Sequence, residues 1–214
     1  MLKLKLFCIR NRNIKTFELE NSFADDTQLI AGIDEVGRGA LAGPVVVGIV
    51  IFQKRNFSWV DQINDSKLLS KPIREKLSML IRENTIWSIG SVSNHVIDQI
   101  GIESSISFAA QLAVEQLENQ PSILLVDGNI KLPNVKIKYE NIIKGDQKSV
   151  SIAAASIIAK VHRDACLLQL DNIFPLYGFA SNAGYGTKKH IHALKSIGPA
   201  TIHRNSFKPV KDLV

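Results

Sequence analysis

Only two cysteines, Cys8 and Cys166, occur among the 214 residues of the sequence. Two cysteines this far apart form neither a disulfide framework nor a metal-ligand spacing. The reducing cytoplasm is therefore the expected compartment. No apolar run approaches the ~18 residues of a membrane span, and the first residues lack the apolar stretch of a signal peptide, so no membrane partner is expected.

Aromatic residues make up only 7% of the chain, and neither an internal repeat nor a low-complexity segment is present. A hydrophobic content of 45% with 21% charged residues excludes the disordered, collagen-like and coiled-coil classes. The length allows one large domain or two small ones, but no linker rich in Pro, Gly or Ser divides the chain. The composition therefore predicts one domain with a substantial hydrophobic core.

The net charge of +6 is unevenly distributed along the chain. Residues 1–16 and 187–214 are both strongly basic, whereas the body between them is net acidic. An acidic centre with basic ends suits a carboxylate metal site flanked by a phosphate-binding surface. Basic ends that only keep a protein in solution are the alternative, and charge alone does not decide between the two.

Five segments rich in β-branched and apolar residues predict strands, at residues 28–36, 44–52, 85–93, 122–126 and 135–143. Helices are expected between and after them, at residues 70–83 (with Ser70 as the N-cap), 94–100, 103–118, 150–173 and 187–196. Residues 175–186 are predicted to form an irregular loop, and the residues after 196 a basic, flexible tail. Strands interleaved with helices indicate one α/β domain with a mixed sheet.

Acidic residues occur beside strands that should be buried. Asp34 and Glu35 lie within the first strand, Asp127 ends the fourth, and Asp146 follows the fifth. A buried carboxylate must be paired, protonated or bound to a metal, and converging carboxylates select hard cations such as Mg²⁺ or Mn²⁺. Any one of these acids alone is better explained by a lysine partner or a helix cap.

Asp34 and Glu35 raise a geometric difficulty, because neighbouring residues of a strand point to opposite faces. Both reach one site if the strand frays or bulges there. Gly37 and Gly39 make such a departure plausible.

Phosphate-binding candidates surround these acids in the sequence. Glycine lets a backbone approach a sugar–phosphate closely, and arginine binds phosphate bidentately, although Gly37-Arg38-Gly39 alone is more often a simple turn. Ser66 and Lys67 offer a hydroxyl and an ammonium group, and a solvated turn is equally consistent with them. Tyr185 offers a ring for stacking on a base or sugar, or for packing on its own domain. Lys188 and Lys189 follow it at a helix start, and the histidines show no zinc-like spacing.

Taken together, these segments resemble the bacterial ribonuclease HII family. The resemblance rests on GIDEVGRGALAGPVVV, NDSKLLS, LLVDGN, KGD, IAAASIIAKVHRD, NAGYGTKKH and HRNSF, in consistent order from about residue 29 to residue 211. It implies a ribonuclease H-like fold, with a five-stranded mixed sheet flanked by helices and a small C-terminal helical part. Residues 28–214 would form the catalytic domain, and residues 1–27 an N-terminal extension outside the resemblance.

The resemblance also implies an activity and a set of site residues. The family hydrolyses the RNA strand of RNA–DNA hybrids and incises DNA on the 5′ side of a single embedded ribonucleotide, leaving 3′-hydroxyl and 5′-phosphate ends. Two Mn²⁺ or Mg²⁺ ions would be bound by Asp34, Glu35, Asp127 and Asp146. Gly37, Arg38 and Gly39 would contact the 2′-hydroxyl, and Tyr185 would stack on the sugar beyond it. Asp164 matches a family motif and is interpreted as a structural or secondary acid, and a monomer is expected.

Three rival functions share part of this pattern. A metal-dependent phosphatase also places aspartates at strand ends, but the sequence has no motif for an aspartyl nucleophile. A non-catalytic nucleic-acid-binding module would carry its buried acids as a liability near phosphate. An integrase-like nuclease shares the acidic site but should accept all-DNA substrates.

Overall fold

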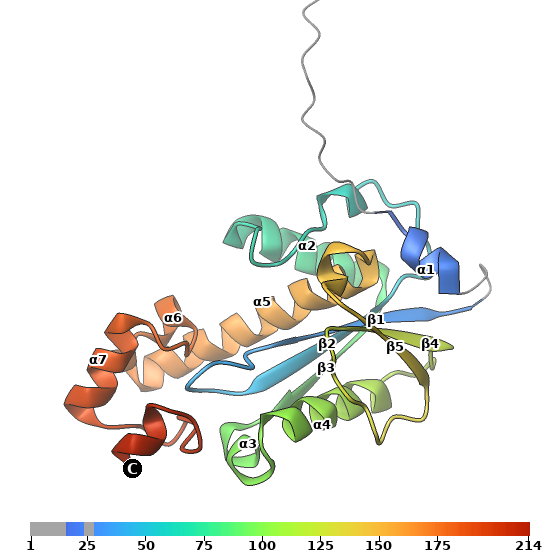
Figure 1. Ribbon diagram of the computed structural model, residues 1–214. Helices are drawn as coiled ribbons and strands as arrows, with labels where there is room; N and C mark the ends of the chain where they lie inside the picture. Colours follow the sequence, from blue (N-terminus) through green and yellow to red (C-terminus); the bar gives the residue numbers. More distant parts are fainter. Residues whose placement is uncertain (1–15, 24–27) are drawn as a thin grey trace, which may run out of the picture.

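The fold is built on one five-stranded sheet, seen in a computed structural model that describes residues 16–23 and 28–214. The strands are β1 (Ile30–Val36), β2 (Val45–Ile51), β3 (Ile86–Val92), β4 (Ile123–Asp127) and β5 (Lys138–Ile142). Their order across the sheet is β3-β2-β1-β4-β5 (Figure 1). β1 pairs antiparallel with β2 and parallel with β4, so the predicted mixed sheet of five strands is confirmed.

Helices cover both faces of the sheet (Figure 1). α5 packs on β1 and β2 with α2 behind it, and α4 packs on the opposite face against β2 and β3. The C-terminal helices form the predicted small helical part, and they extend past one end of the sheet (Figure 1). The described helices are α1 (Glu18–Phe23), α2 (Lys71–Asn84), α3 (Asn94–Ile100), α4 (Ile102–Glu115), α5 (Val150–Ile173), α6 (Phe179–Asn182) and α7 (Lys188–Ile197), with short 3₁₀ turns η1 (Val60–Gln62), η2 (Gly145–Gln147), η3 (Pro175–Tyr177) and η4 (Val210–Leu213).

Small residues let α5 lie close to the centre of the sheet. A Cβ atom at Gly48 of β2 would come within 2.5 Å of the carbonyl oxygen of Ala155, so only glycine fits there. Ala159 of α5 lies at the same contact, and the alanines from Ala153 to Ala155 and Ala159 are all fully buried. This close packing fixes the register of α5 against β1, the strand that carries Asp34 and Glu35.

The residues after α7 are not the flexible tail that the sequence suggested. Ala42 forms a bridge with His203, and η4 ends the chain with Val210 fully buried. Arg204, which contributes to the basic C-terminal charge, is itself fully buried and donates hydrogen bonds to the carbonyl oxygens of Gly43 and Arg38. A net charge taken from the sequence does not distinguish such a buried arginine from one that is exposed on the surface.

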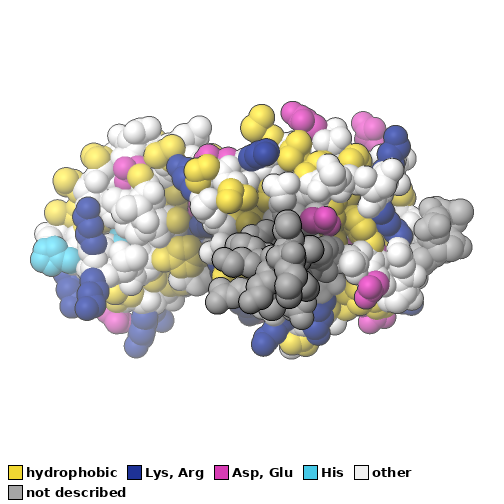
Figure 2. Space-filling model, turned by 90° about the horizontal axis from the view of Figure 1, so that it is seen from above, with side chains coloured by type: hydrophobic (Ala, Val, Ile, Leu, Met, Phe, Trp, Pro, Cys, Tyr) yellow, Lys and Arg dark blue, Asp and Glu magenta, His cyan; other side chains and the backbone are white. Residues whose placement is uncertain are grey.

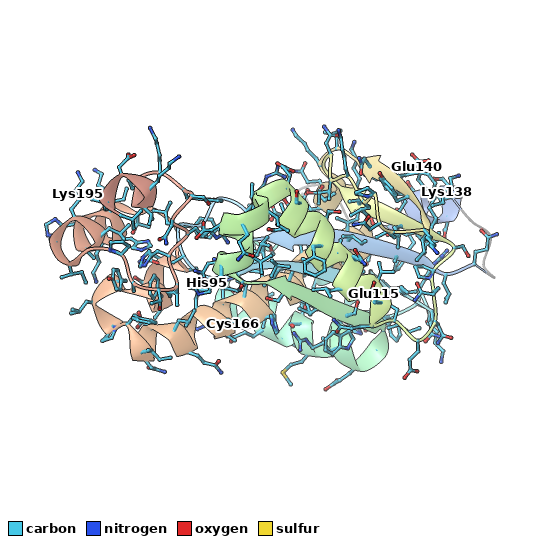
Figure 3. The ribbon with its side chains drawn as sticks, turned by 90° about the horizontal axis from the view of Figure 1, so that it is seen from below. His95, Glu115, Lys138, Glu140, Cys166 and Lys195 are labelled. Atoms are coloured by element: carbon cyan, nitrogen blue, oxygen red, sulfur yellow. The ribbon has the colours of Figure 1, made fainter. Side chains whose placement is uncertain are left out.

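Figure 3 shows the extent of the molecule along the sheet. Lys195 on α7 lies at one end, and Lys138 and Glu140 on the edge strand β5 lie at the other. Cys166 on α5 is a free, half-buried thiol, whereas Cys8 lies outside the described residues. Among the helices of the described ranges, none combines the length and the apolar character needed to cross a membrane.

Candidate active site

Two aspartates meet at the ends of neighbouring parallel strands. The pairing of β1 with β4 ends at Ile33 and Val126, and Asp34 and Asp127 are the next residues of the two strands. Asp34 faces α5 and is only 8% exposed. The carboxyl ends of parallel strands are where sites form in α/β sheets, and the sequence prediction relied on that rule.

Glu35 reaches the same place without the predicted bulge or fraying. β1 pairs with β2 residue by residue through Val36, opposite Val46, so no extra residue interrupts the ladder. The expectation of an irregular strand was wrong because it overlooked the unequal strand lengths. β4 pairs with β1 only as far as Ile33, so no strand covers that side of Glu35, and its side chain lines the same cavity as Asp34.

Asp146 is brought in by the turn η2, which connects β5 to α5. The backbone N–H of Gly145 donates a 2.6 Å hydrogen bond to Oδ1 of Asp127. This bond ties the turn that carries one carboxylate to the carboxylate of β4.

The carboxylates line one cavity of about 360 Å³. Ser66 and Lys67, from the loop before α2, and Tyr185, from the loop before α7, line it as well. The complete lining is Asp34, Glu35, Val36, Ser66, Lys67, Asp127, Asp146, Ser156, Lys160 and Tyr185. The structure therefore gathers seven of the twelve predicted site residues in one cavity, although five others lie outside its lining: Gly37, Arg38, Gly39, Lys188 and Lys189.

Burial and mutual repulsion of its carboxylates make this cavity a candidate cation site. Burial, and then the charges of Glu35 and Asp127, hold the pKa of Asp34 well above its usual range. Burial also raises the pKa of Glu35, with Asp127 adding to the shift and Arg38 opposing it. No group of three or more acidic, histidine or cysteine side chains in the described ranges already stands at closed metal-ligand spacing. The donor set of buried, mutually repelling oxygens nevertheless fits hard divalent cations.

The turn that follows β1 lies beside this cavity. Gly37 has a φ of +92°, and a Cβ atom there would come within 2.2 Å of Nε of Arg163, so glycine is required on both counts. Gly39 has open space around it. Arg38 is half-exposed, with its guanidinium 3.6 Å from Glu35 and in contact with Glu103 of α4.

Arg163 of α5 holds this turn and the Tyr185 loop together. It is fully buried and donates hydrogen bonds to the carbonyl oxygens of Pro44, Ala42 and Ala183, at 2.8 to 3.0 Å. Its guanidinium carbon also lies 5.5 Å from the centre of the Tyr185 ring. One buried cation thus fixes the two segments that the sequence assigned to the substrate.

Lys188 and Lys189 begin α7 and are exposed, next to the Tyr185 loop. Figure 2 shows Lys and Arg side chains gathered at the end of the molecule that the C-terminal helices form. These lysines lie outside the lining of the cavity and are exposed to solvent.

Comparison with known protein families decides the relationship. The family model described as Ribonuclease HII matches residues 31–210. The chain belongs to the ribonuclease HII family. The ribonuclease HII of Endomicrobium trichonymphae is 44% identical over 203 residues, which cover 94% of this chain and 95% of that protein. The ribonuclease HII of Lactobacillus acidophilus is 47% identical over 212 residues, which cover 97% of this chain and 82% of that protein.

Solved structures give the same fold. The crystal structure of ribonuclease H2 from Pyrococcus horikoshii superposes with a TM-score of 0.73 at 24% identity, covering 86% of this chain and 96% of that one. The structure of Bst-RNase HIII in complex with Mn²⁺ gives a TM-score of 0.66 at 18% identity, covering 87% and 69%. These likenesses confirm the predicted ribonuclease H-like fold.

Membership in the ribonuclease HII family makes the chain a metal-dependent endoribonuclease, a class that cleaves the RNA strand of RNA–DNA hybrids. It therefore argues against two of the rivals, the phosphatase and the non-catalytic binding module.

Two residues that line the cavity were missed by sequence reasoning. The hydroxyl of Ser156 on α5 hydrogen-bonds to Asp34 and so opposes part of the rise in the pKa of that acid, and its Oγ lies 2.9 Å from that of Ser66. Lys160, one turn later, also lines the cavity. A hydroxyl and an ammonium four residues apart in the otherwise apolar stretch 152–161 of this helix were the available signal. Asp164 lies 2.7 Å from Lys160 and lines a neighbouring cavity, so it contacts the site through that lysine.

Proposed function

We propose that Asp34, Glu35, Asp127 and Asp146 bind two divalent ions, Mn²⁺ or Mg²⁺, and that the enzyme incises duplex DNA on the 5′ side of a single embedded ribonucleotide. The products carry 3′-hydroxyl and 5′-phosphate ends. The observation that supports this most strongly is the convergence of four carboxylates from β1, β4 and η2 on one cavity. When bound, two such ions supply an activated water, charge neutralisation at the phosphate and stabilisation of the leaving oxygen.

In this proposal some residues bind the cations and others recognise the ribonucleotide. Asp34, Glu35, Asp127 and Asp146 supply anionic oxygens, and Ser156 orients Asp34 through its hydroxyl. No histidine lines this cavity among the described residues, so no imidazole base is assigned. Lys67 is exposed at the cavity and is assigned to a phosphate group next to the reacting one, with Ser66 as part of the wall beside it.

Recognition of the ribonucleotide is assigned to the turn after β1. The 2′-hydroxyl is the feature that separates RNA from DNA, and it both donates and accepts hydrogen bonds. Open space at Gly39 lets the backbone approach a sugar, and half-exposed Arg38 offers donors beside Glu35. Tyr185 lines the cavity and supplies a ring to stack on the adjoining sugar. Reading one 2′-hydroxyl is sufficient to select a lone ribonucleotide.

The proposed partners are RNA–DNA hybrids and ribonucleotide-containing duplex DNA, acted on by a monomer in the cytoplasm. The free Cys166 thiol and the nucleic-acid substrate support that compartment. The exposed Lys188 and Lys189 at the start of α7 support a duplex-binding surface next to the cavity.

Incubation with a duplex that bears one ribonucleotide tests the function directly. With Mg²⁺ or Mn²⁺ we expect one cut, on the 5′ side of the ribonucleotide, and with EDTA no cut. An all-DNA duplex of the same sequence should remain intact, and a continuous RNA–DNA hybrid should be cut at several positions. Equal cleavage of the all-DNA duplex would instead support the integrase-like alternative, and cleavage of the hybrid alone would refute single-ribonucleotide incision.

The salt dependence of binding tests the role of α7. The double variant Lys188→Ala, Lys189→Ala should weaken binding to every duplex and reduce the slope of log Kd against log salt by about one to two, because each phosphate contact contributes about 0.9. The matched control is Lys136→Ala, Lys138→Ala, which removes the same charge at and just before β5, and Lys138 lies at the other end of the molecule from α7 (Figure 3). Equal slopes for the two variants would place the binding surface elsewhere.

A further inference from the structure

The short helix α1 lies on the body of the domain (Figure 1), and apolar contacts hold it there. Phe17, just before it, makes an edge-to-face contact with Phe52, with ring centres 5.1 Å apart. Leu19 and Phe23 pack on a buried cluster that includes Ile30 of β1. These contacts hold α1 beside the first turn of α5 and so determine where the side chain of Glu20 lies.

Glu20 is buried at the N-terminus of α5. The residue is 1% exposed, and its Oε1 accepts hydrogen bonds from Oγ of Ser149 at 2.7 Å and from the backbone N–H of Ser151 at 2.9 Å. Its Oε2 is buried without a hydrogen-bond partner among the described residues. Burial of a carboxylate is costly, so this arrangement requires a compensating interaction.

The dipole of α5 supplies that compensation. A helix N-terminus favours a negative charge, and α5, 24 residues long, has no acidic residue in its own first turn. Ser149 is its N-cap. The hydroxyl of Ser149 accepts a 3.0 Å hydrogen bond from the N–H of Ile152 and donates a hydrogen bond to Glu20. Glu20 thus provides, from another element, the anion that α5 lacks.

The same hydrogen bonds continue to the carboxylate turn. The backbone N–H of Ser149 donates to the carbonyl oxygen of Gly145 at 2.8 Å, which closes the turn that carries Asp146. The N–H of Gly145 in turn donates to Oδ1 of Asp127. A continuous path therefore joins Glu20 to two of the carboxylates of the cavity.

We propose that Glu20 is a positioning residue for the metal-binding carboxylates. By fixing Ser149 at the start of α5, it sets the η2 turn and with it the separation of Asp146 from Asp127. This inference rests on the proposed function, because it takes Asp146 and Asp127 as cation ligands. Hydrogen-bonding groups behind the ligands of a metal site commonly change its affinity by about 10- to 100-fold when they are removed.

A purely stabilising role makes a different prediction. If Glu20 only caps α5, its loss lowers the free energy of unfolding and leaves cation affinity unchanged. Phe23→Ala is the matched control, because it weakens the packing of the same helix without touching the hydrogen bonds of Ser149.

The experiment measures Mn²⁺ binding by titration calorimetry on the full-length protein without substrate, together with the Mn²⁺ concentration that gives half-maximal cleavage. For Glu20→Ala we expect the dissociation constant for Mn²⁺ and the half-maximal concentration to rise by about tenfold, with the maximal rate largely recovered at saturating Mn²⁺. Phe23→Ala should lower the melting temperature and leave both values unchanged.

Other outcomes overturn the inference. An unchanged Mn²⁺ affinity in Glu20→Ala refutes the positioning role, as does an equal loss of affinity in Phe23→Ala. If Glu20→Ala does not fold, Ser149→Ala decides, because it removes the hydroxyl that donates to Glu20 and leaves the Glu20 side chain in place. A rise in the Mn²⁺ dissociation constant of Ser149→Ala supports the role, and no rise refutes it.

A parallel titration of Asp146→Asn separates this inference from the proposed function. If Asp146→Asn weakens Mn²⁺ binding and Glu20→Ala does not, only the positioning role fails. If Asp146→Asn binds Mn²⁺ like the unaltered protein, the proposed ligand set fails and the positioning role fails with it.

Discussion

Asp34→Asn is expected to abolish cleavage while the protein remains folded. The substitution removes the most deeply buried carboxylate of the cavity and replaces it with a neutral amide, which binds hard cations poorly. Cation stabilisation of a phosphoryl transition state is worth several kcal/mol, so the rate should fall by about 10³-fold or more. The measurement is single-turnover cleavage of the one-ribonucleotide duplex at saturating Mg²⁺, and turnover near that of the unaltered protein would show that the assigned metal site is wrong.

The same substitution should raise stability when cations are removed with EDTA. The pKa of Asp34 is higher in the folded protein than in the unfolded chain, chiefly because of burial and then because of Glu35 and Asp127. The folded state therefore holds the proton more tightly, and stability declines as pH rises from the unfolded pKa through the folded one. Above that range the ionised Asp34 destabilises the fold, and an uncharged Asn removes the penalty.

Thermal unfolding with and without Mg²⁺ tests this expectation. In EDTA near neutral pH, Asp34→Asn should melt at a higher temperature than the unaltered protein, and added Mg²⁺ should raise its melting temperature less. Asp61→Asn is the control, because Asp61 is an exposed acid on η1 whose loss changes the net charge equally. A lower melting temperature for Asp34→Asn in EDTA would contradict the electrostatic description of the cavity.

The sheet and the carboxylates were predictable because their signals are local. Buried strands such as residues 45–51 consist of β-branched and apolar residues, and a carboxylate in such a setting stands out. Asp34 and Asp127 were recognisable in this way without any knowledge of the fold. Asp146 was recognisable because it follows a strand directly.

The supporting residues were not predictable, because their roles depend on contacts distant in sequence. In the sequence Arg163 looks like any surface arginine, yet it is buried and donates hydrogen bonds to three backbone carbonyl oxygens from two loops. Arg204 is also buried, and its hydrogen bond to the carbonyl oxygen of Arg38 means that part of the expected basic tail supports the turn after β1. Glu20 hydrogen-bonds to Ser149, 129 residues further along the chain. Local periodicity carries no information about such pairs.

The irregular strand expected at Asp34 and Glu35 shows a different limit. Side chains alternate along β1 as the rule describes, but alternation does not decide whether a side chain reaches round an unpaired edge of the sheet. β1 extends beyond the pairing with β4, and at its end Glu35 has β2 on one side only. Relative strand lengths decide this geometry, and a single strand sequence does not contain them.

Tyr185→Ala is expected to separate substrate choice from metal binding. The ring lines the cavity but belongs to the loop before α7, and that loop is held by backbone contacts that the substitution leaves intact. The N–H of Leu41 donates to the carbonyl oxygen of Gly184, and Nδ1 of His190 lies 2.9 Å from the carbonyl oxygen of Tyr185. The loop should therefore keep its position when the ring is removed.

Stacking on a sugar or base is worth about 1–3 kcal/mol, which corresponds to a loss of about ten- to a hundredfold in cleavage of the one-ribonucleotide duplex. A continuous RNA strand offers other registers and other 2′-hydroxyls, so the loss on a hybrid should be smaller. Tyr185→Phe is the matched control, since it keeps the ring and should retain most of the activity on both substrates. Mn²⁺ affinity, measured by titration calorimetry, should be the same in all three proteins. Equal losses on both substrates together with weaker Mn²⁺ binding would instead make the ring a structural support for the cavity, because a stacking contact has no means of changing the affinity of the carboxylates for a cation.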